Sequence, residues 1–197
     1  MAARVDYFYS FRSPYSYLSA PRAFALADDY EIDLRFRGVI PMMMRGQSVP
    51  TAKRIHTLRD AKREADRLKM PFGHIHDPLG EGATRCLGVS EHAIDLGRQR
   101  EFVLSAGQGI WSEATDPATE PGLRLICERA GLEWEGCQAA LSDPAIADRV
   151  EANTQELLDI GHWGVPVFVY GGEQFWGQDR IDDLALVLSD AGLDRRL

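Results

Sequence analysis

The residues best placed to do chemistry lie in a short stretch, Ser13-Pro14-Tyr15-Ser16, which follows an apolar and aromatic run over residues 5–9. The run is typical of a β-strand. Ser13 has the position of a helix N-cap and Pro14 that of a first helical residue, so we expect a helix to begin here. A helix N-terminus carries roughly half a positive charge and presents free N–H groups. The stretch therefore predicts a small anion site, to which the Ser13 hydroxyl adds a donor.

Thiol–disulfide enzymes of the thioredoxin class place two cysteines at such a strand-to-helix corner, because the helix dipole stabilises a thiolate. Here both positions carry a hydroxyl, at Ser13 and Ser16. Disulfide exchange needs a thiolate at the corner, so the sequence argues against a disulfide oxidoreductase. If the corner stabilises a thiolate, the sulfur must arrive with a ligand. The alternative is that Ser13 only caps a helix. Other parts of the sequence are needed to distinguish a thiolate site from a simple helix cap.

Composition indicates a soluble globular protein whose partners are small molecules or a second copy of itself. The chain has 197 residues, of which 45% are hydrophobic, and this is enough for a sizeable core. A net charge of −8 argues against a nucleic-acid or anionic-membrane surface. No signal segment or apolar run of membrane length is visible, which predicts a cytoplasmic protein.

The cysteines and histidines give no pattern typical of a metal site. Three cysteines, an odd number without ligand spacing, predict neither a disulfide framework nor bound zinc. His74 and His76 are spaced like metal ligands, but the surrounding prolines and glycines favour a loop. We therefore expect no metal.

The order of the predicted elements is that of an α/β frame interrupted by helices. A strand over residues 5–9, a helix over 16–27 and a strand over 31–39 form a β-α-β unit, whose strands should be parallel with a right-handed crossover. After an irregular link, only helices are predicted for a long interval, and no internal repeat suggests a solenoid. They cover residues 52–69, 83–96, 99–114, 117–130, 134–141 and 144–160.

Near the end of the chain the sequence again shows the residue pattern of β-strands. Residues 165–170 and 173–176 read as two strands joined by a Gly-Gly turn, and residues 180–191 read as an amphipathic helix. Pro166 cannot donate to a ladder, so it must begin the strand, lie at an edge or be cis. The chain thus divides into a frame, residues 1–40 and 161–197, and an all-helical insertion subdomain, residues 41–160.

Four motifs occur in order over nearly the whole chain: Ser13-Pro14-Tyr15-Ser16-Tyr17-Leu18; Pro50 to Lys53, leading to Asp60, Arg63 and Pro71; Gly164-Val165-Pro166; and Phe175-Trp176-Gly177-Gln178-Asp179-Arg180. With them the chain resembles the thioredoxin fold as elaborated in the DsbA-like group. More narrowly, it resembles the 2-hydroxychromene-2-carboxylate isomerase family and its sister, the kappa-class glutathione transferases. The fold that this resemblance implies is α/β, thioredoxin-like, with a large all-helical insertion.

The resemblance also implies glutathione as the cofactor and assigns residues to it. Ser13 is then the catalytic residue, beside the glutathione sulfur, and Lys53 contacts the tripeptide. Pro166 is expected to be cis, and Val165 to pair by its backbone with the cysteinyl part. Without the resemblance, Lys53 would read as part of a solvated helix face.

Four further residues complete the implied site. Gln178 and Asp179 hold the γ-glutamyl end, Asp179 because an ammonium group calls for a carboxylate. Asp179 also precedes a helix, so N-capping alone could explain it. Trp163 could shape an aromatic-acid pocket or fill core. Lys53 and Arg180 are candidates for binding the substrate carboxylate, and Arg180 could equally cap the last helix or pair with Asp182 or Asp183.

The activity implied is glutathione-dependent cis–trans isomerisation between 2-hydroxychromene-2-carboxylate and trans-o-hydroxybenzylidenepyruvate, or a related aromatic-degradation intermediate, in a homodimer. A free thiol has a pKa near 8.5. A helix terminus contributes up to about 2 kcal/mol and a hydrogen bond to a charged group about 1.5–3 kcal/mol, so Ser13 can hold a thiolate without a histidine. Two alternatives remain open: a kappa-type glutathione transferase or peroxidase, and a redox-inactive thioredoxin-fold binding module.

Overall fold

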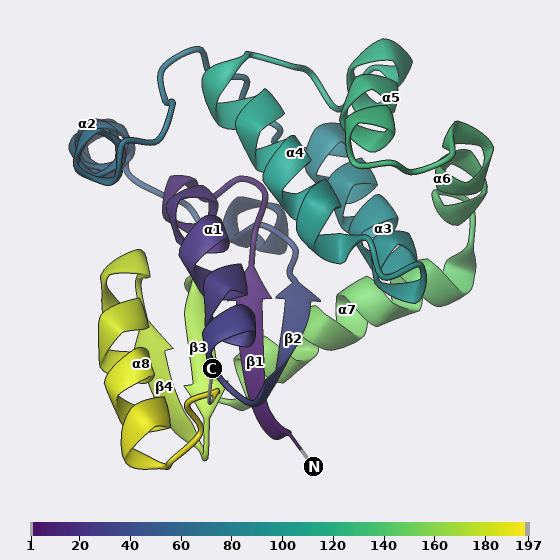
Figure 1. Ribbon diagram of the computed structural model, residues 1–197. Helices are drawn as coiled ribbons and strands as arrows, with labels where there is room; N and C mark the ends of the chain where they lie inside the picture. Colours follow the sequence, from purple (N-terminus) through teal and green to yellow (C-terminus); the bar gives the residue numbers. More distant parts are fainter. Residues whose placement is uncertain (1, 196–197) are drawn as a thin grey trace.

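A four-stranded mixed sheet, in the order β2-β1-β3-β4, forms the centre of the molecule (Figure 1). The computed structural model describes residues 2–195. The first two strands are parallel, as expected for a β-α-β unit, and the last two form an antiparallel hairpin against β1. The strands are β1 (Ala3–Tyr9), β2 (Ile32–Gly38), β3 (Val167–Tyr170) and β4 (Glu173–Trp176).

Helices account for the rest of the regular structure. Each predicted helix is present, with ends that differ from the expected ones by at most a few residues, and two short 3₁₀ helices were not predicted. The helices are α1 (Pro14–Asp29), α2 (Thr51–Leu68), α3 (Glu81–Asp95), α4 (Gln99–Ser112), α5 (Glu120–Arg129), α6 (Trp134–Ala140), α7 (Pro144–Asp159) and α8 (Ile181–Asp190), with the 3₁₀ helices η1 (Met42–Arg45) and η2 (Gln178–Arg180). None of the helices in residues 2–195 is long and apolar enough to cross a membrane.

The sheet is covered on both faces, α1 and α8 lying on one side and α7 on the other (Figure 1). Alternation along β1 explains this, because successive side chains of a strand point to opposite faces. Tyr7 is fully buried on the α1 side, where its hydroxyl lies 2.7 Å from Ser19 Oγ. Phe8 points the other way and packs with Leu157 of α7. The first strand is therefore the buried axis of a three-layer arrangement.

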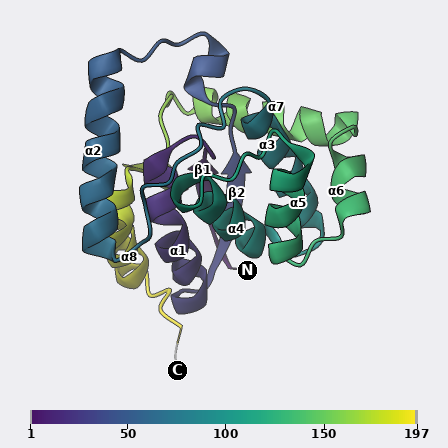
Figure 2. The same ribbon diagram turned by 90° about the horizontal axis from the view of Figure 1, so that it is seen from above.

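The inserted helices do not form an independent core. Helices α3 to α6 gather beside the sheet, whereas α2 stands apart from them (Figure 2). Phe102 and Leu123 in the inserted helices belong to the same continuous apolar cluster as Tyr7 in the sheet. In α2, only Ala61 and Ala65 are buried. The insertion is thus continuous with the frame through packing, and α2 is its most loosely covered helix.

Candidate active site

The strand-to-helix corner is built as its sequence predicts. Ser13 is the N-cap of α1, and its Oγ accepts a hydrogen bond from the Ser16 N–H at 3.1 Å. Pro14 occupies the first turn, where its missing N–H costs nothing. The Ser13 hydroxyl in turn donates to the Val165 carbonyl oxygen at 3.2 Å. The predicted cap is confirmed, and the same hydroxyl connects α1 to the loop that precedes β3.

That loop contains the cis peptide bond between Val165 and Pro166, as predicted. The Pro166 carbonyl accepts from the Gly177 N–H at 3.0 Å, which joins the loop to the start of η2. Within residues 2–195 the Val165 N–H has no hydrogen-bond partner. The residue opposite Ser13 therefore retains a free backbone donor.

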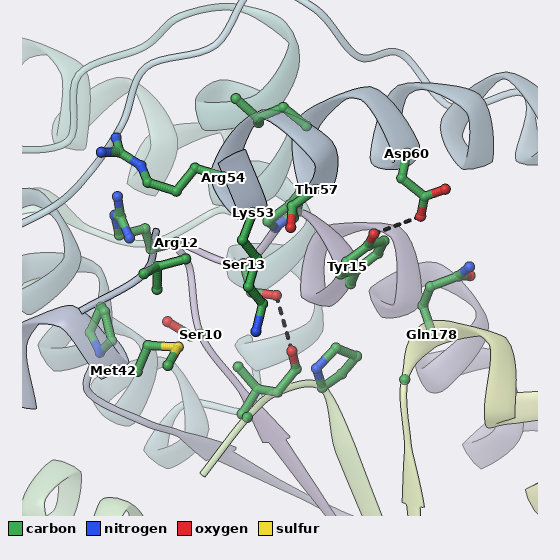
Figure 3. Close-up of a pocket in the computed structure, with 18 of the residues that line it drawn as sticks. Ser10, Arg12, Ser13, Tyr15, Met42, Lys53, Arg54, Thr57, Asp60 and Gln178 are labelled. Carbon is green, nitrogen blue, oxygen red and sulfur yellow. Dashed lines mark hydrogen bonds between the residues drawn. The ribbon is translucent and has the colours of Figure 1, made fainter. Parts of the chain in front are cut away.

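A cavity of about 680 Å³ opens at this corner, between α2 and the sheet (Figure 3). It is lined by short pieces of chain from the ends of β1 and β2, from α2, and from the segments on either side of β3 and β4. The structure brings together in it all but one of the predicted site residues: Ser13, Lys53, Trp163, Val165, Pro166, Gln178 and Asp179.

Arg180 is the exception. It does not line the cavity, and its half-exposed guanidinium pairs with Asp179 at 3.2 Å and with Asp183 at 2.9 Å. These contacts match the alternative of pairing within the last helix, and a role for Arg180 in binding the substrate carboxylate stays a prediction. Asp179 does not cap α8, because the N-cap position falls on Arg180 and no side chain there makes a capping bond.

Gln178 lies at the cavity wall but its side chain is already engaged. It is only 6% exposed, Arg22 of α1 donates to both its backbone and its side-chain oxygen, and its Nε2 donates to Glu64 of α2 at 3.1 Å. Both the oxygen and the nitrogen of the Gln178 side-chain amide therefore already have hydrogen-bond partners. The contacts indicate a residue that holds three elements together, and any ligand contact from Gln178 has to be made beside them.

Charge is divided between the two ends of the cavity (Figure 3). Four carboxylates line the cavity: Asp60, Glu64 and Asp179, which come from the middle of α2 and from η2, and Asp77, which pairs with Arg12. Four of the five lining cations gather near the other end, at the start of α2 and around η1; they are Arg12, Arg45, Lys53 and Arg54. The fifth, Arg67, pairs with Glu64, so the α2–η2 end keeps a net negative charge and the other end a net positive one. Figure 3 shows Ser13 between Arg12 and Arg54 on one side and Asp60 on the other. Such a cavity is complementary to a ligand with a cationic end and an anionic end.

Tyr15 was not predicted to belong to the site, although it is part of the recognised motif. Its hydroxyl donates to Asp60 Oδ2 at 2.6 Å, and both residues line the cavity. Burial, together with this hydrogen bond to a carboxylate, raises the pKa of Tyr15 well above its ordinary value. The phenol is therefore neutral at physiological pH and orients Asp60. No sequence signal paired these two residues, because they are 45 positions apart on different helices.

An aromatic wall closes one side of the cavity. The rings of Trp163 and Trp176 meet edge to face with centroids 5.5 Å apart, and the Lys53 ammonium lies 5.4 Å from the Trp163 ring. Both indoles are about half exposed. The wall gives the site an apolar surface for a flat ligand, with a cation beside it.

None of the five histidines lines the cavity. His162 packs against Trp176, burial lowers its pKa, and its Nδ1 contacts the Gly164 backbone. His76 pairs with Asp116 at 3.1 Å. Within residues 2–195 no three histidines, cysteines or acids cluster as metal ligands. The polar groups that the chain itself places in the cavity are hydroxyls, amides, backbone groups and charged side chains.

Comparison with known proteins agrees with this geometry. The family model of the DSBA-like thioredoxin domain matches residues 4–189. The chain belongs to the DsbA-like thioredoxin family. The predicted fold is confirmed, since the strand order, the cis Pro166 opposite the helix corner and the family match agree.

Within this family, the curated relatives of the DsbA-like chain include 2-hydroxychromene-2-carboxylate isomerases. The protein of that name from Pseudomonas putida is 24% identical over 188 residues, which cover 90% of each chain. The one from Sphingobium xenophagum is 25% identical and covers 96% of this chain and 100% of the relative.

Solved structures give the same picture of the fold. A 2-hydroxychromene-2-carboxylate isomerase superposes with a TM-score of 0.81 at 23% identity, with 95% of both chains covered. The cytosolic disulfide reductase DsbM from Pseudomonas aeruginosa, in a structure with GSH, gives 0.70 at 18% identity, covering 94% of this chain and 99% of that one.

This DsbA-like chain differs from a thiol–disulfide enzyme at the decisive position. Its three cysteines, Cys86, Cys127 and Cys137, are free and buried, and none lies at the corner. Burial raises the pKa of the Cys86 thiol above its ordinary value. The protein therefore has no thiolate of its own in the cavity.

Proposed function

We propose that this protein is a glutathione-dependent cis–trans isomerase that interconverts 2-hydroxychromene-2-carboxylate and trans-o-hydroxybenzylidenepyruvate, or a related aromatic-degradation intermediate. The observation that carries the proposal is the Ser13 hydroxyl, which caps α1 and lies in a large cavity without a cysteine. The isomerases among the relatives support the reaction class.

The residues present fit glutathione. The tripeptide has an ammonium and two carboxylates around a central thiol, and the cavity has an end of net negative charge, an end of net positive charge and Ser13 between them. Asp179 would hold the γ-glutamyl ammonium, Lys53 the tripeptide's anionic side, and the free Val165 N–H the cysteinyl backbone. Bound there, glutathione would supply the nucleophile for reversible addition to a conjugated carbon, which lets the former double bond rotate.

The chain's own contribution is to stabilise negative charge at the corner. The Ser13 hydroxyl, which donates to the Val165 carbonyl, can turn to donate into the cavity while its oxygen still accepts from the Ser16 N–H. A hydrogen bond to a charged group contributes about 1.5–3 kcal/mol and the helix terminus up to about 2 kcal/mol. Together they exceed the roughly 2.7 kcal/mol that corresponds to two pKa units, so no general base is required.

The aromatic wall of Trp163 and Trp176 offers a binding surface for the second substrate. Trp163 and Trp176 present half-exposed ring faces and edges to the cavity, next to the loop that carries Val165. A planar conjugated substrate gains from such contacts by apolar burial and by ring stacking. The wall therefore favours an aromatic substrate beside the corner.

Two measurements test the proposal. Calorimetry with glutathione separates an enzyme of this kind from a redox-inactive binding module, which would show no heat of binding. Turnover of 2-hydroxychromene-2-carboxylate, followed by absorbance, is then compared with conjugation of a chloronitrobenzene. Isomerisation without conjugation supports the proposal, whereas conjugation alone would assign the protein to the kappa-type transferases.

The homodimer implied by the resemblance is part of the same proposal. Light scattering after size-exclusion chromatography should give about twice the 22.0 kDa of one chain. A mass of one chain at all concentrations would reject the dimer, but it would not contradict the proposed reaction in the cavity.

A further inference from the structure

We infer that Arg45 binds the carboxylate of the second, aromatic substrate, so that the cavity selects aromatic acids over their neutral analogues. The inference deepens the proposed function and takes the existence of that substrate from it. The residue was not a candidate from sequence, because Arg45 lies in an irregular link between a strand and a charged helix.

The guanidinium of Arg45 is held in place by backbone oxygens. Its Nε donates to the Ile40 carbonyl at 3.0 Å and its Nη2 to the Trp163 carbonyl at 2.9 Å. Its Nη1 is buried and has no hydrogen-bond partner within residues 2–195. Arg45 lines the cavity, and a guanidinium that is fixed by two backbone oxygens and still lacks one hydrogen-bond partner is preorganised to bind an oxygen anion.

Arg45 also differs from the other cations that line the cavity. Arg12 is neutralised by Asp77, whose oxygens lie 2.7 and 2.8 Å from it. Lys53, Arg54 and Arg67 are exposed on α2, where water compensates their charge, and Arg67 also pairs with Glu64. No carboxylate of residues 2–195 lies within salt-bridge distance of the half-buried Arg45.

An uncompensated charge of this kind is unfavourable until an anion arrives. Burial lowers the pKa of Arg45, but a guanidinium remains protonated in proteins. The charge has therefore lost part of its hydration without gaining a counter-ion. A ligand carboxylate bound to the Arg45 guanidinium would supply that counter-ion, which explains why the chain can retain a half-buried arginine here.

Ser10 supplies a second donor at the same edge of the sheet. Ser10 follows β1 and Ile40 follows β2, and these parallel strands end side by side because Tyr9 is paired with Gly38. The Ser10 side chain is 3% exposed, lines the cavity, and has an Oγ without a hydrogen-bond partner among the described residues.

The aromatic wall makes the same region suitable for the ring of the ligand. Arg45 binds the carbonyl of Trp163, whose indole lines the cavity. A ligand whose carboxylate reaches Arg45 can thus place its ring against the indole. The two donors and the wall together describe a small planar aromatic acid.

Binding of trans-cinnamate and of its neutral amide, cinnamamide, tests the inference by tryptophan fluorescence. We expect the wild-type protein to bind cinnamate at least about tenfold more tightly than cinnamamide, as a charge-assisted hydrogen bond predicts. Arg45→Gln should abolish this preference while leaving the affinity for cinnamamide within about twofold. Arg54→Gln, which removes an exposed cation from the same cavity, is the matched control and should keep the preference.

A purely structural role for Arg45, as a link between η1 and the loop at Trp163, predicts a different result. Both ligands would then weaken together in Arg45→Gln. In that case Arg45→Lys decides: it keeps the charge but cannot make both backbone bonds, so a retained preference supports the inference and a lost one overturns it. Equal binding of the two ligands by the wild-type protein, or an unchanged preference in Arg45→Gln, also overturns it.

These titrations contain neither glutathione nor a hydroxychromene, so the two proposals can fail separately. An Arg45-dependent preference in a protein without isomerase activity would reject only the proposed function. Isomerase activity in a protein without that preference would reject only the role of Arg45.

Discussion

The Ser13 hydroxyl makes two hydrogen bonds at the same time, and this explains how it can both cap a helix and stabilise an anion in the cavity. Its oxygen accepts from the Ser16 N–H within the helix turn, and its hydrogen goes to the Val165 carbonyl across the cavity mouth. Only the second bond has to be exchanged when an anion is present. The cap therefore keeps the hydroxyl in position while its proton is redirected.

Ser13→Ala should lower turnover about 10- to 150-fold, because a hydrogen bond to a charged group contributes about 1.5–3 kcal/mol and each 1.36 kcal/mol is tenfold in rate. The variant also loses an N-cap, which costs about 1 kcal/mol of stability. Steady-state kinetics and urea unfolding separate the two effects.

Thr119→Ala is the matched control for this change. Thr119 caps α5 by accepting from the Gly122 N–H at 3.2 Å, and it does not line the cavity. It should lose comparable stability and keep full turnover. If Ser13→Ala kept wild-type turnover, Ser13 would be a helix cap and nothing more.

Substitution of Asp179 tests whether the γ-glutamyl end of glutathione lies beside this residue. Its carboxylate is more than half exposed and pairs with Arg180, so its removal should weaken glutathione binding by only about fivefold, as for an exposed ion pair of about 1 kcal/mol. Calorimetry on Asp179→Asn should show this loss for glutathione and none for cysteinylglycine, which has no γ-glutamyl group.

Asp183→Asn controls for the shared arginine, because Asp183 also pairs with Arg180 but lies outside the cavity. Its affinity for glutathione should equal that of the wild type. Equal losses in the two variants would instead mean that the charge near Arg180, and not a direct contact from Asp179, affects binding.

At the scale of the elements, the sequence predicted most of what the structure contains. Prolines, glycines and hydroxyl caps lie at the helix ends, and periodicity within each segment identified its type, so helix and strand limits agree closely. The two 3₁₀ helices were missed because three or four residues are too few to show a period. Gln178 lies in one of these missed elements, η2, from which its amide reaches α1 and α2.

Gln178→Ala should destabilise the protein by about 1–3 kcal/mol, the cost of leaving buried groups without partners. The amide joins Arg22 of α1 to Glu64 of α2, and Arg22 already has a buried Nε without a partner among the described residues. Urea unfolding measures the loss. Gln174→Ala, which removes an exposed bond of 2.7 Å to the Ile160 carbonyl, should cost less than half as much.

At the scale of the whole molecule, the cavity could be predicted only in part. The residues that lie in recognisable motifs were found, since Ser13, Val165 and Asp179 each lie where an element begins or ends. Arg45 and the pair of Tyr15 with Asp60 became visible only in three dimensions, because their importance comes from a missing or a distant partner. Charge separation across a cavity depends on how α2 is placed, and spacing along the chain does not determine that.

Glu91 gives the molecule an unusual dependence of stability on pH. It is 4% exposed between α3 and α7, and burial raises its pKa although Asn153 donates to it at 2.7 Å and Arg149 lies 3.5 Å away. A carboxyl whose pKa is raised in the folded state stabilises the fold below its unfolded pKa, and this contribution is lost as pH rises through the folded pKa. At pH 7, where the carboxyl group of the unfolded chain is ionised, Glu91 therefore contributes less to the stability of the fold than it does at low pH.

Asp95 has the opposite sign and shares the same arginine. Its hydrogen bonds from Arg149, both 2.8 Å, hold its pKa below the ordinary value, so its contribution is present at pH 7 and is lost as pH falls through the folded pKa. Two carboxyls around one guanidinium thus act against each other, and substitution by the matching amide should separate them.

Glu91→Gln should be as stable as the wild type or more stable at pH 7, and the difference should vanish toward pH 4, where Glu91 is protonated. Asp95→Asn should be less stable at pH 7, with a difference that shrinks more gradually as pH falls. Urea midpoints between pH 4 and 7 measure both. A loss of stability at pH 7 in Glu91→Gln as large as that in Asp95→Asn would show that the ion pair with Arg149 outweighs the burial of the Glu91 carboxylate.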